Sequence, residues 1–320
     1  ATVSNYLAAL RLFSRDIRYF LLASALHGFV FFGIYALLLN LYLLRLGYGP
    51  AFIGMTNAAG PLALAAMSLP AGVFSRRIGS RRALIMGYFF SAIGLTLVAM
   101  GEAFPAPWSG RWIMASYGLA WLSGALIVVN MGPYIMGATT PTERSHAFSV
   151  QSAVLPVSGF VGNLVGGLLP GLVALALGMS LADAAPYRYA LIAAGLLDFL
   201  AVVAMWQTRE VAAAAPTLTG EQRRSPLPAL LIGVVAGVWM LRIGSEWTMR
   251  VFFNVYLDTE LGVSTALIGA LLAVGQLLGL AALFAPYAIN RYGAVRTIVG
   301  GMVGMALAFL PLILISHWLA

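Results

Sequence analysis

The chain has 320 residues, of which 61% are hydrophobic and only 9% charged, with a formal net charge of +8 and no cysteine. Its mean hydropathy of +0.93 excludes a soluble globular domain, because most of the surface of such a domain must stay in contact with water. The lack of cysteine excludes disulfides, thiol catalysis and cysteine-bound metals. Long continuous apolar runs predict membrane-spanning helices, since a β-barrel would show alternating apolar and polar residues.

Nine membrane spans are predicted in chain order. Their expected ranges are about 18–44, 51–74, 83–103, 112–138, 147–174, 187–207, 228–257, 264–289 and 297–319. A polar, proline-bearing segment between the sixth and seventh spans predicts a linker between two halves. We therefore expect a six-helix bundle over residues 1–207, a cytoplasmic linker over 208–227 and a C-terminal bundle over 228–320.

Arginine is distributed unevenly among the predicted loops. With the N-terminus placed in the cytoplasm, only Arg45, Arg111 and Arg188 fall in segments on the outside. Cytoplasmic loops of membrane proteins are enriched in lysine and arginine. We therefore expect a cytoplasmic N-terminus. The expected location of the protein is the cytoplasmic (inner) membrane of a bacterium. Because the arginines are scattered among short loops, they do not predict a nucleic-acid partner.

Two stretches near the start of the chain recur near its end. RLGYGPAFIG at 45–54 matches ELGVSTALIG at 260–269 with an offset of 215 residues. RRIGSRRALIMG at 76–87 matches NRYGAVRTIVGG at 290–301 with an offset of 214. Two matches in the same order predict that spans seven to nine repeat spans one to three. A complete second half would then have six spans, so we expect about nine helices of a twelve-helix molecule to be present.

The loop between the second and third predicted spans reads GVFSRRIGSRR. It resembles the signature G-x-x-x-D-R-x-G-R-R of the major facilitator superfamily of secondary transporters. The matching positions are Gly72, Arg77, Gly79, Arg81 and Arg82, with Arg76 in place of the aspartate. The second half keeps Arg291 and Gly293, with Asn290 at the acidic position. In span five, GNLVGG at 162–167 is similar to the antiporter motif G-P-x-x-G-G, with Asn163 in place of the proline.

The resemblance implies two six-helix bundles around a central substrate cavity that opens alternately to each side of the membrane. In this family the first helix of each three-helix unit lines the cavity, which here means spans one, four and seven. The resemblance further implies a small-molecule substrate, a monomer in the lipid bilayer and no cofactor. The loop signature is expected to take part in gating.

Three charged residues lie inside the seventh span, in the stretch RIGSEWTMR. Arg242, Glu246 and Arg250 are spaced i, i+4 and i+8, so they share one face of a helix. A charge near the bilayer centre costs about 2.5–3.5 kcal/mol even on insertion scales, so this face is expected to line the cavity or contact a partner. One positive charge is left in excess, and Asp198 in span six or a bound anion is expected to balance it.

The repeat relates this charged face to an equivalent set of residues in the other half. An offset of 215 relates its three positions to His27, Phe31 and Tyr35 in span one. These residues supply a titratable imidazole and two aromatic rings, which together make a plausible half-pocket for a ligand.

The charged residues suggest a division of roles. We predict that Glu246 or His27 carries a coupling proton, while Arg242 or Arg250 holds substrate charge or controls the carboxylate. The alternatives are a structural ion network in span seven, a hydrogen-bonding role for His27 and a counter-ion role for Asp198.

Enzyme chemistry is not expected. Histidine occurs only at positions 27, 146 and 317, at different depths, and neither HExxH nor a phosphate-binding G-x-x-x-x-G-K-[ST] pattern occurs. We therefore predict a proton-coupled secondary transporter for an organic anion or an amphipathic compound. A drug-type proton antiporter for export and a non-transporting membrane sensor of the same fold are the alternatives.

Overall fold

The computed structural model describes residues 13–105, 108–211, 233, 237, 248–278 and 291–308. Every regular element in these ranges is a helix. The helices that are long and apolar enough to cross a membrane are Arg15–Arg45, Pro50–Ile78, Ser80–Val98, Trp108–Ala138, Glu143–Leu177 and Ala185–Trp206. They coincide with the first six predicted spans. Helices also cover residues 248–257, 265–278 and 297–308 of the last three predicted spans.

The first span is built from three consecutive helical segments. α2 covers Arg15–His27, the π-helical segment η1 covers Gly28–Tyr35 and α3 covers Ala36–Arg45. Ser14 begins the span, because its side-chain oxygen accepts a hydrogen bond of 3.3 Å from the backbone N–H of Ile17. η1 occupies the middle of this span, and π-helical turns inside α-helices are frequent at functional sites.

The remaining helices follow in chain order. These helices are α4 (Pro50–Ile78), α5 (Ser80–Val98), the 3-10 turn η2 (Gly101–Ala103), α6 (Trp108–Ala138), α7 (Pro141–Leu177), α8 (Ala185–Trp206), α10 (Thr265–Leu278) and α12 (Ala294–Ala308). Residues 248–259 are also helical. Proline stands in the first turn of α4, α7 and α8, where its missing N–H costs no intrahelical hydrogen bond.

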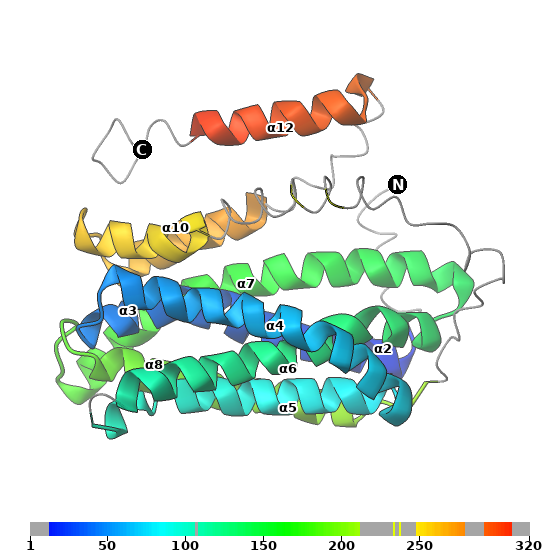
Figure 1. Cartoon of the computed structure of the whole chain (residues 1–320), viewed down its shortest axis with the longest axis horizontal. Helices are drawn as coiled ribbons and strands as arrows, with labels where there is room; N and C mark the ends of the chain where they lie inside the picture. Colours follow the sequence, from blue (N-terminus) through cyan, green and yellow to red (C-terminus); the bar gives the residue numbers. More distant parts are fainter. Residues whose placement is uncertain are drawn as a thin grey trace.

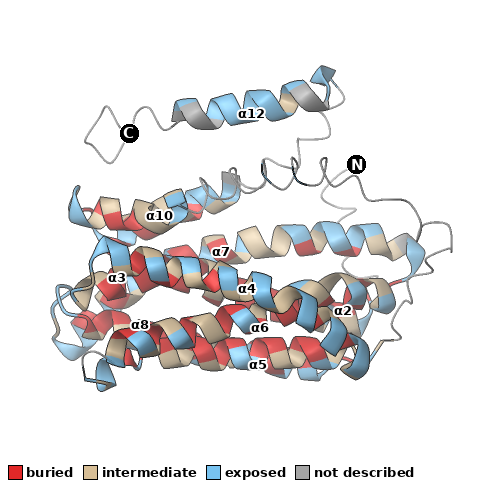
Figure 2. Cartoon of the chain, in the orientation of Figure 1, coloured by how far each residue is buried: buried red, intermediate tan, exposed pale blue. Residues whose placement is uncertain are grey.

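The helices of the first half lie side by side along the long axis of the molecule (Figure 1). α5 packs against α6 and α8, α4 against α6, and α2 against α8, while α7 packs against both η1 and α10. Buried residues gather on the faces between these helices (Figure 2). One buried cluster surrounds η1 and α3 and includes Tyr35, Leu38 and Tyr42. α7, a helix of the first half, therefore packs against α10 as well as against η1.

Glycines let α7 approach both of these neighbours at backbone distance. A Cβ atom at Gly162 would collide with the carbonyl oxygen of Phe29 in η1 and would lie 2.8 Å from the Cα atom of Gly33. A Cβ atom at Gly167 would lie 3.1 Å from the Cα atom of Gly269 in α10. The GNLVGG segment noted in the sequence is thus the part of α7 that lies between η1 and α10.

The internal repeat recurs in the backbone conformation. Gly47 follows α3 and Gly262 follows the helical segment 248–259, and their φ angles are 83° and 58°. Gly79 and Gly293, which precede α5 and α12, have φ angles of 89° and 82°. Residues with a Cβ atom rarely adopt this left-handed region. The same positions therefore turn the chain in the same way in both halves.

The C-terminal ends of α3 and of the helical segment 248–259 show which residues of the two halves are equivalent more accurately than the sequence match does. The backbone N–H of Leu46 and that of Glu260 each close the last turn of their helix, with bonds of 3.0 Å, and these residues are 214 apart. The turn that follows is one residue longer in the second half, which explains the offset of 215 in the sequence match. In this register Arg250 is equivalent to Ala36, and Tyr35 stands one position away.

Candidate functional site

A buried histidine–carboxylate pair joins α2 to α8 inside the first half. Nδ1 of His27 lies 3.2 Å from both carboxylate oxygens of Asp198. The Asp198 side chain has no exposed surface, and that of His27 is 9% exposed, so bulk water is excluded from the contact. The sequence singled out both residues on separate spans, and the structure brings them together.

Aromatic and hydroxyl side chains surround the imidazole. The His27 ring centroid lies 5.3 Å from that of Phe31 and 5.4 Å from that of Tyr88. The Tyr88 hydroxyl lies 3.3 Å from Oγ of Ser24, one turn earlier in α2. Among the described residues, His27 is the only ion-pair partner of Asp198.

Phe31 and Tyr35, which the sequence grouped in one half-pocket, take different positions. The Tyr35 hydroxyl is buried and donates to the backbone carbonyls of Leu95 at 2.5 Å and Leu191 at 3.0 Å. Phe31 is half-buried, and its ring centroid lies 5.2 Å from that of Trp121 in α6. Tyr35 therefore ties span one to α5 and α8, whereas Phe31 extends the aromatic surroundings of the imidazole.

Two of the three charged residues predicted in span seven, Arg242 and Glu246, lie outside the described residues. Arg250 is described and exposed, near the start of the helical segment 248–259. The role of this charged face in substrate or proton handling stays a prediction.

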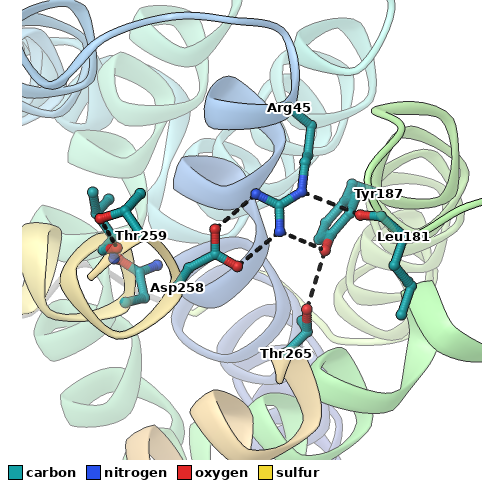
Figure 3. A network of polar contacts seen from close by, with 8 residues as sticks. Arg45, Leu181, Tyr187, Asp258, Thr259 and Thr265 are labelled. Carbon is teal, nitrogen blue, oxygen red and sulfur yellow. Dashed lines mark hydrogen bonds and ion pairs between the residues drawn. The ribbon is translucent and has the colours of Figure 1, made fainter. Parts of the chain in front are cut away.

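A charged network joins α3 and α8 to the second half at the end of α3 (Figure 3). The Arg45 guanidinium donates two hydrogen bonds of 2.7 Å to the two carboxylate oxygens of Asp258. It also donates to the Leu181 carbonyl oxygen at 3.1 Å and to the Tyr187 hydroxyl at 3.4 Å. That hydroxyl lies 3.1 Å from Oγ1 of Thr265 in α10. The sequence placed Arg45 in an outside loop but did not identify its partner.

The opposite end of span one carries a cationic pocket. A cavity of about 540 Å³ is lined by Arg15, Arg18, Tyr19 and Leu22. These residues follow the spacing i, i+3, i+4, i+7, so they share one face of α2. The Arg15 guanidinium lies 5.3 Å from the centre of the Tyr19 ring and donates a long hydrogen bond of 3.5 Å to Gln207. The pocket therefore offers two cations beside an aromatic ring and a leucine.

A sequence profile of the Major Facilitator Superfamily matches residues 20–320. The chain belongs to the Major Facilitator Superfamily. The match confirms the predicted fold class, an all-α polytopic membrane protein of this superfamily, and makes the chain a member of a family of secondary transporters.

Two solved structures of a bacterial homolog to the human lysosomal transporter Spinster share the fold of this superfamily member. The inward-facing and occupied form aligns with a TM-score of 0.70 and 15% identity, covering 94% of this chain and 68% of that chain. The inward-facing and unoccupied form aligns with a TM-score of 0.67 and 17% identity, covering 92% of this chain and 63% of that chain. No curated protein sequence matches the chain.

The positions that match the superfamily signature lie around the α4–α5 turn and its repeat. Gly72 lies in α4, where a Cβ atom would contact α6. Arg77 in the last turn of α4 and Arg82 in the first turn of α5 are exposed. In the second half, Arg291 and Gly293 are exposed immediately before α12. Their role in gating stays a prediction.

An acid from elsewhere in the chain lies at the α4–α5 turn, where Arg76 replaces the aspartate of the superfamily signature. A Cβ atom at Gly79 would lie 2.5 Å from Oε1 of Glu210. This oxygen accepts a hydrogen bond of 3.2 Å from the backbone N–H of Arg81, so the carboxylate caps the positive end of α5. The Arg81 guanidinium donates to the Trp206 carbonyl oxygen at 2.7 Å. The turn is thus fastened to the end of α8.

We expect Glu210→Ala to destabilise this turn by about 0.3–1 kcal/mol, because a carboxylate at a helix N-terminus contributes that much. Glu210→Gln should lose less, since its amide oxygen still accepts the bond from Arg81. The thermal midpoint of the detergent-solubilised protein measures the effect. Glu260→Ala, at an exposed acid in the turn at the opposite end of the molecule, is the matched control. Equal midpoints for Glu210→Ala and the control would contradict the capping role.

Proposed function

We propose that the protein is a secondary transporter that moves a small organic anion together with a proton, and that the His27–Asp198 pair holds the coupling proton. The observation that carries this proposal is the burial of the pair, with 3.2 Å between the imidazole and the carboxylate, inside a bundle of membrane-spanning helices. Ionisable residues inside membrane helices are costly and mark ion pathways or proton relays.

The charge balance of the pair gives a route by which proton binding affects cavity opening. With a proton added to the imidazole, the pair has no net charge, and without it the pair carries one negative charge. A buried charge without compensation is expensive, whereas a neutral and hydrogen-bonded pair is tolerated. A movement that admits water between α2 and α8 therefore changes the relative stability of the two forms. This difference in stability between the protonated and the unprotonated pair links proton binding to the movement of α2 relative to α8.

The cationic pocket at the start of α2 supports an anionic substrate. Arg15 and Arg18 place two positive charges on one helix face, next to Tyr19 and Leu22. Clefts lined by one sign of charge raise the local concentration of the opposite charge and its association rate. In the predicted orientation this pocket faces the cytoplasm. An anion that moves with one proton also crosses the apolar part of the bilayer with less net charge.

The other expectations from the sequence remain part of this proposal. They are a monomer in the cytoplasmic membrane of a bacterium, a cytoplasmic N-terminus, and a linker over 208–227 between two bundles. Glu246 remains a second candidate for the coupling proton. Arg242 and Arg250 remain candidates for holding substrate charge, with Phe31 on the facing side.

Purified protein in sealed proteoliposomes with an internal pH dye tests the proposal. Small carboxylates and phosphate esters are added outside one at a time, with neutral sugars and organic cations as comparison compounds. We expect at least one class of anion, and none of the neutral compounds, to change the internal pH beyond the signal from protein-free liposomes. Uptake of a labelled anion without a pH change would contradict proton coupling. An amphipathic cation that drives protons in the opposite direction would favour the drug antiporter.

The pocket yields a prediction for the same assay. Arg18→Gln should raise the KM for the transported anion about two- to fivefold, the range set by the energy of an exposed charge pair, with little change in maximal rate. The KM should also depend less on salt, because less of the attraction is left to screen. Arg111→Gln, which removes an exposed arginine near the start of α6, is the control. An unchanged KM in Arg18→Gln would contradict the anion-capture role.

A further inference from the structure

Two asparagines meet where α3 contacts the second half, between η1 and the Arg45 network. Nδ2 of Asn40 donates to the carbonyl oxygen of Val251 at 2.7 Å, and Nδ2 of Asn254 donates to the carbonyl oxygen of Leu37 at 2.8 Å. Nδ2 of Asn40 also lies 3.4 Å from Oδ1 of Asn254. Each asparagine thus binds the backbone of the other residue's helix.

The internal repeat relates these two bonds to each other. Asn40 and Asn254 are 214 residues apart, and so are their acceptors Leu37 and Val251, which is the register that the ends of these helices share. A contact in which residue i meets j, and j meets i, is the mark of a two-fold axis. The halves of such transporters are related by an axis along the membrane normal. The asparagine pair therefore lies on the axis that runs through the transport path.

Burial and a third asparagine fix the geometry of the pair. The exposed fractions of Asn40 and Asn254 are 3% and 0%, so water does not compete for their bonds in this conformation. Nδ2 of Asn57 in α4 donates to Oδ1 of Asn40 at 2.8 Å. Because this bond engages the amide oxygen, it directs the amide nitrogen of Asn40 toward the second half.

We propose that Asn40 and Asn254 form a two-fold amide clamp that closes the central cavity on the side of Arg45 and must separate whenever that side opens. This inference rests on the alternating opening that the proposed transport function requires. A contact on the central axis blocks the path itself. The Arg45–Asp258 bonds join the same two helices, α3 and the segment 248–259, nearer to their C-terminal ends. They close the edge of the cavity beside the clamp.

Amide groups suit a closure that has to open repeatedly. When the halves separate, water replaces each lost hydrogen bond, so the open state leaves no polar group unsatisfied. An apolar contact of the same size would expose its surface to water at every opening and would hold the halves together more strongly. The clamp therefore closes the path without making the closed state permanent.

The chain contains no cysteine, so one introduced thiol reports on the clamp without background. Ala36 is exposed and lies one helical turn from Asn40, on the side of η1. In intact cells, a membrane-impermeant maleimide added outside should label Ala36→Cys slowly, because the closed clamp lies between the outside solution and the introduced thiol. Adding Asn40→Ala and Asn254→Ala together should raise this rate about tenfold, since two buried hydrogen bonds no longer hold the halves together. Each single change should give a smaller increase.

Asn130→Ala is the matched control, because Asn130 is equally buried and its bonds among the described residues go to Ser75 and Leu126 within the first half. It should leave the labelling rate of Ala36→Cys unchanged. The inference is overturned if the double variant is labelled as slowly as its parent, or if the parent is already labelled as fast as the variant. A permeant maleimide verifies that the thiol is reactive in every folded variant. Because no substrate or proton enters this assay, failure of proton coupling would not be mistaken for failure of the clamp.

Discussion

Asp198→Asn is expected to reduce substrate-dependent proton movement in proteoliposomes to the level of protein-free liposomes while the protein remains folded. The amide matches the carboxylate in shape and still accepts a hydrogen bond from the His27 imidazole, which lies 3.2 Å away. It carries no charge, so adding a proton to the imidazole would create a buried positive charge without a partner, which is unfavourable. The pair would then no longer bind and release a proton as the cavity opens.

His27→Ala separates this functional role from a purely structural one. It leaves the fully buried carboxylate of Asp198 without its partner, and removal of one member of a buried ion pair costs about 3–5 kcal/mol. We therefore expect a clearly lower thermal midpoint for His27→Ala but not for Asp198→Asn. Asp183→Asn, at an exposed acid in the α7–α8 loop, controls for the loss of one carboxylate. Normal proton movement in Asp198→Asn would assign the pair a structural role and leave Glu246 as the coupling candidate.

The second large effect is expected from Gly162→Ala in α7. The added methyl group would overlap the carbonyl oxygen of Phe29 and would lie 2.8 Å from the Cα atom of Gly33. Because both obstacles are backbone, they cannot move aside as a flexible side chain would. Overpacking of a tight contact costs about 1–3 kcal/mol, so we expect the thermal midpoint and the yield of folded protein to fall.

Gly171→Ala provides a matched control on the same helix. Apart from its neighbours and the adjacent backbone of α7, no atom of the described residues would lie within 4 Å of a Cβ atom at Gly171, and alanine is about 1 kcal/mol more favourable than glycine inside a helix. This variant should be as stable as the parent or slightly more stable. If Gly162→Ala and Gly171→Ala had the same midpoint, the close approach of α7 to η1 would not contribute to stability.

The sequence was sufficient to predict the fold class and the first six spans, because apolar run length alone decides whether a helix can cross a membrane. It also singled out Asp198, because a charge inside a span is unusual, and His27, because the repeat related it to the charged face of span seven. It could not predict that they pair, because they are 171 residues apart and meet only when α2 packs against α8. The repeat offset taken from the loops was one residue too long for the helix ends, because the intervening turns differ in length.

Other parts of the site left weaker signals in the sequence. Glu210 lies far along the chain from the turn that it caps, so a search for the signature acid within its own loop could not find it. Asn40 and Asn254 did carry a signal, because the repeat makes them equivalent. That signal has meaning only once the two helices are known to face each other. The π-helical geometry of η1 has no comparable signature in the sequence.

The reciprocal bonds of Asn40 and Asn254 also bear on the origin of the two halves. A two-fold contact needs a single surface that complements itself, so one asparagine in an ancestral half-length chain would supply both partners when two identical copies associated. Such a homodimer would already possess the closure, and each substitution at that position would alter both sides at once. Fusion of the copies into one chain removes this constraint, so that Asn57 can support one partner of the pair and not the other.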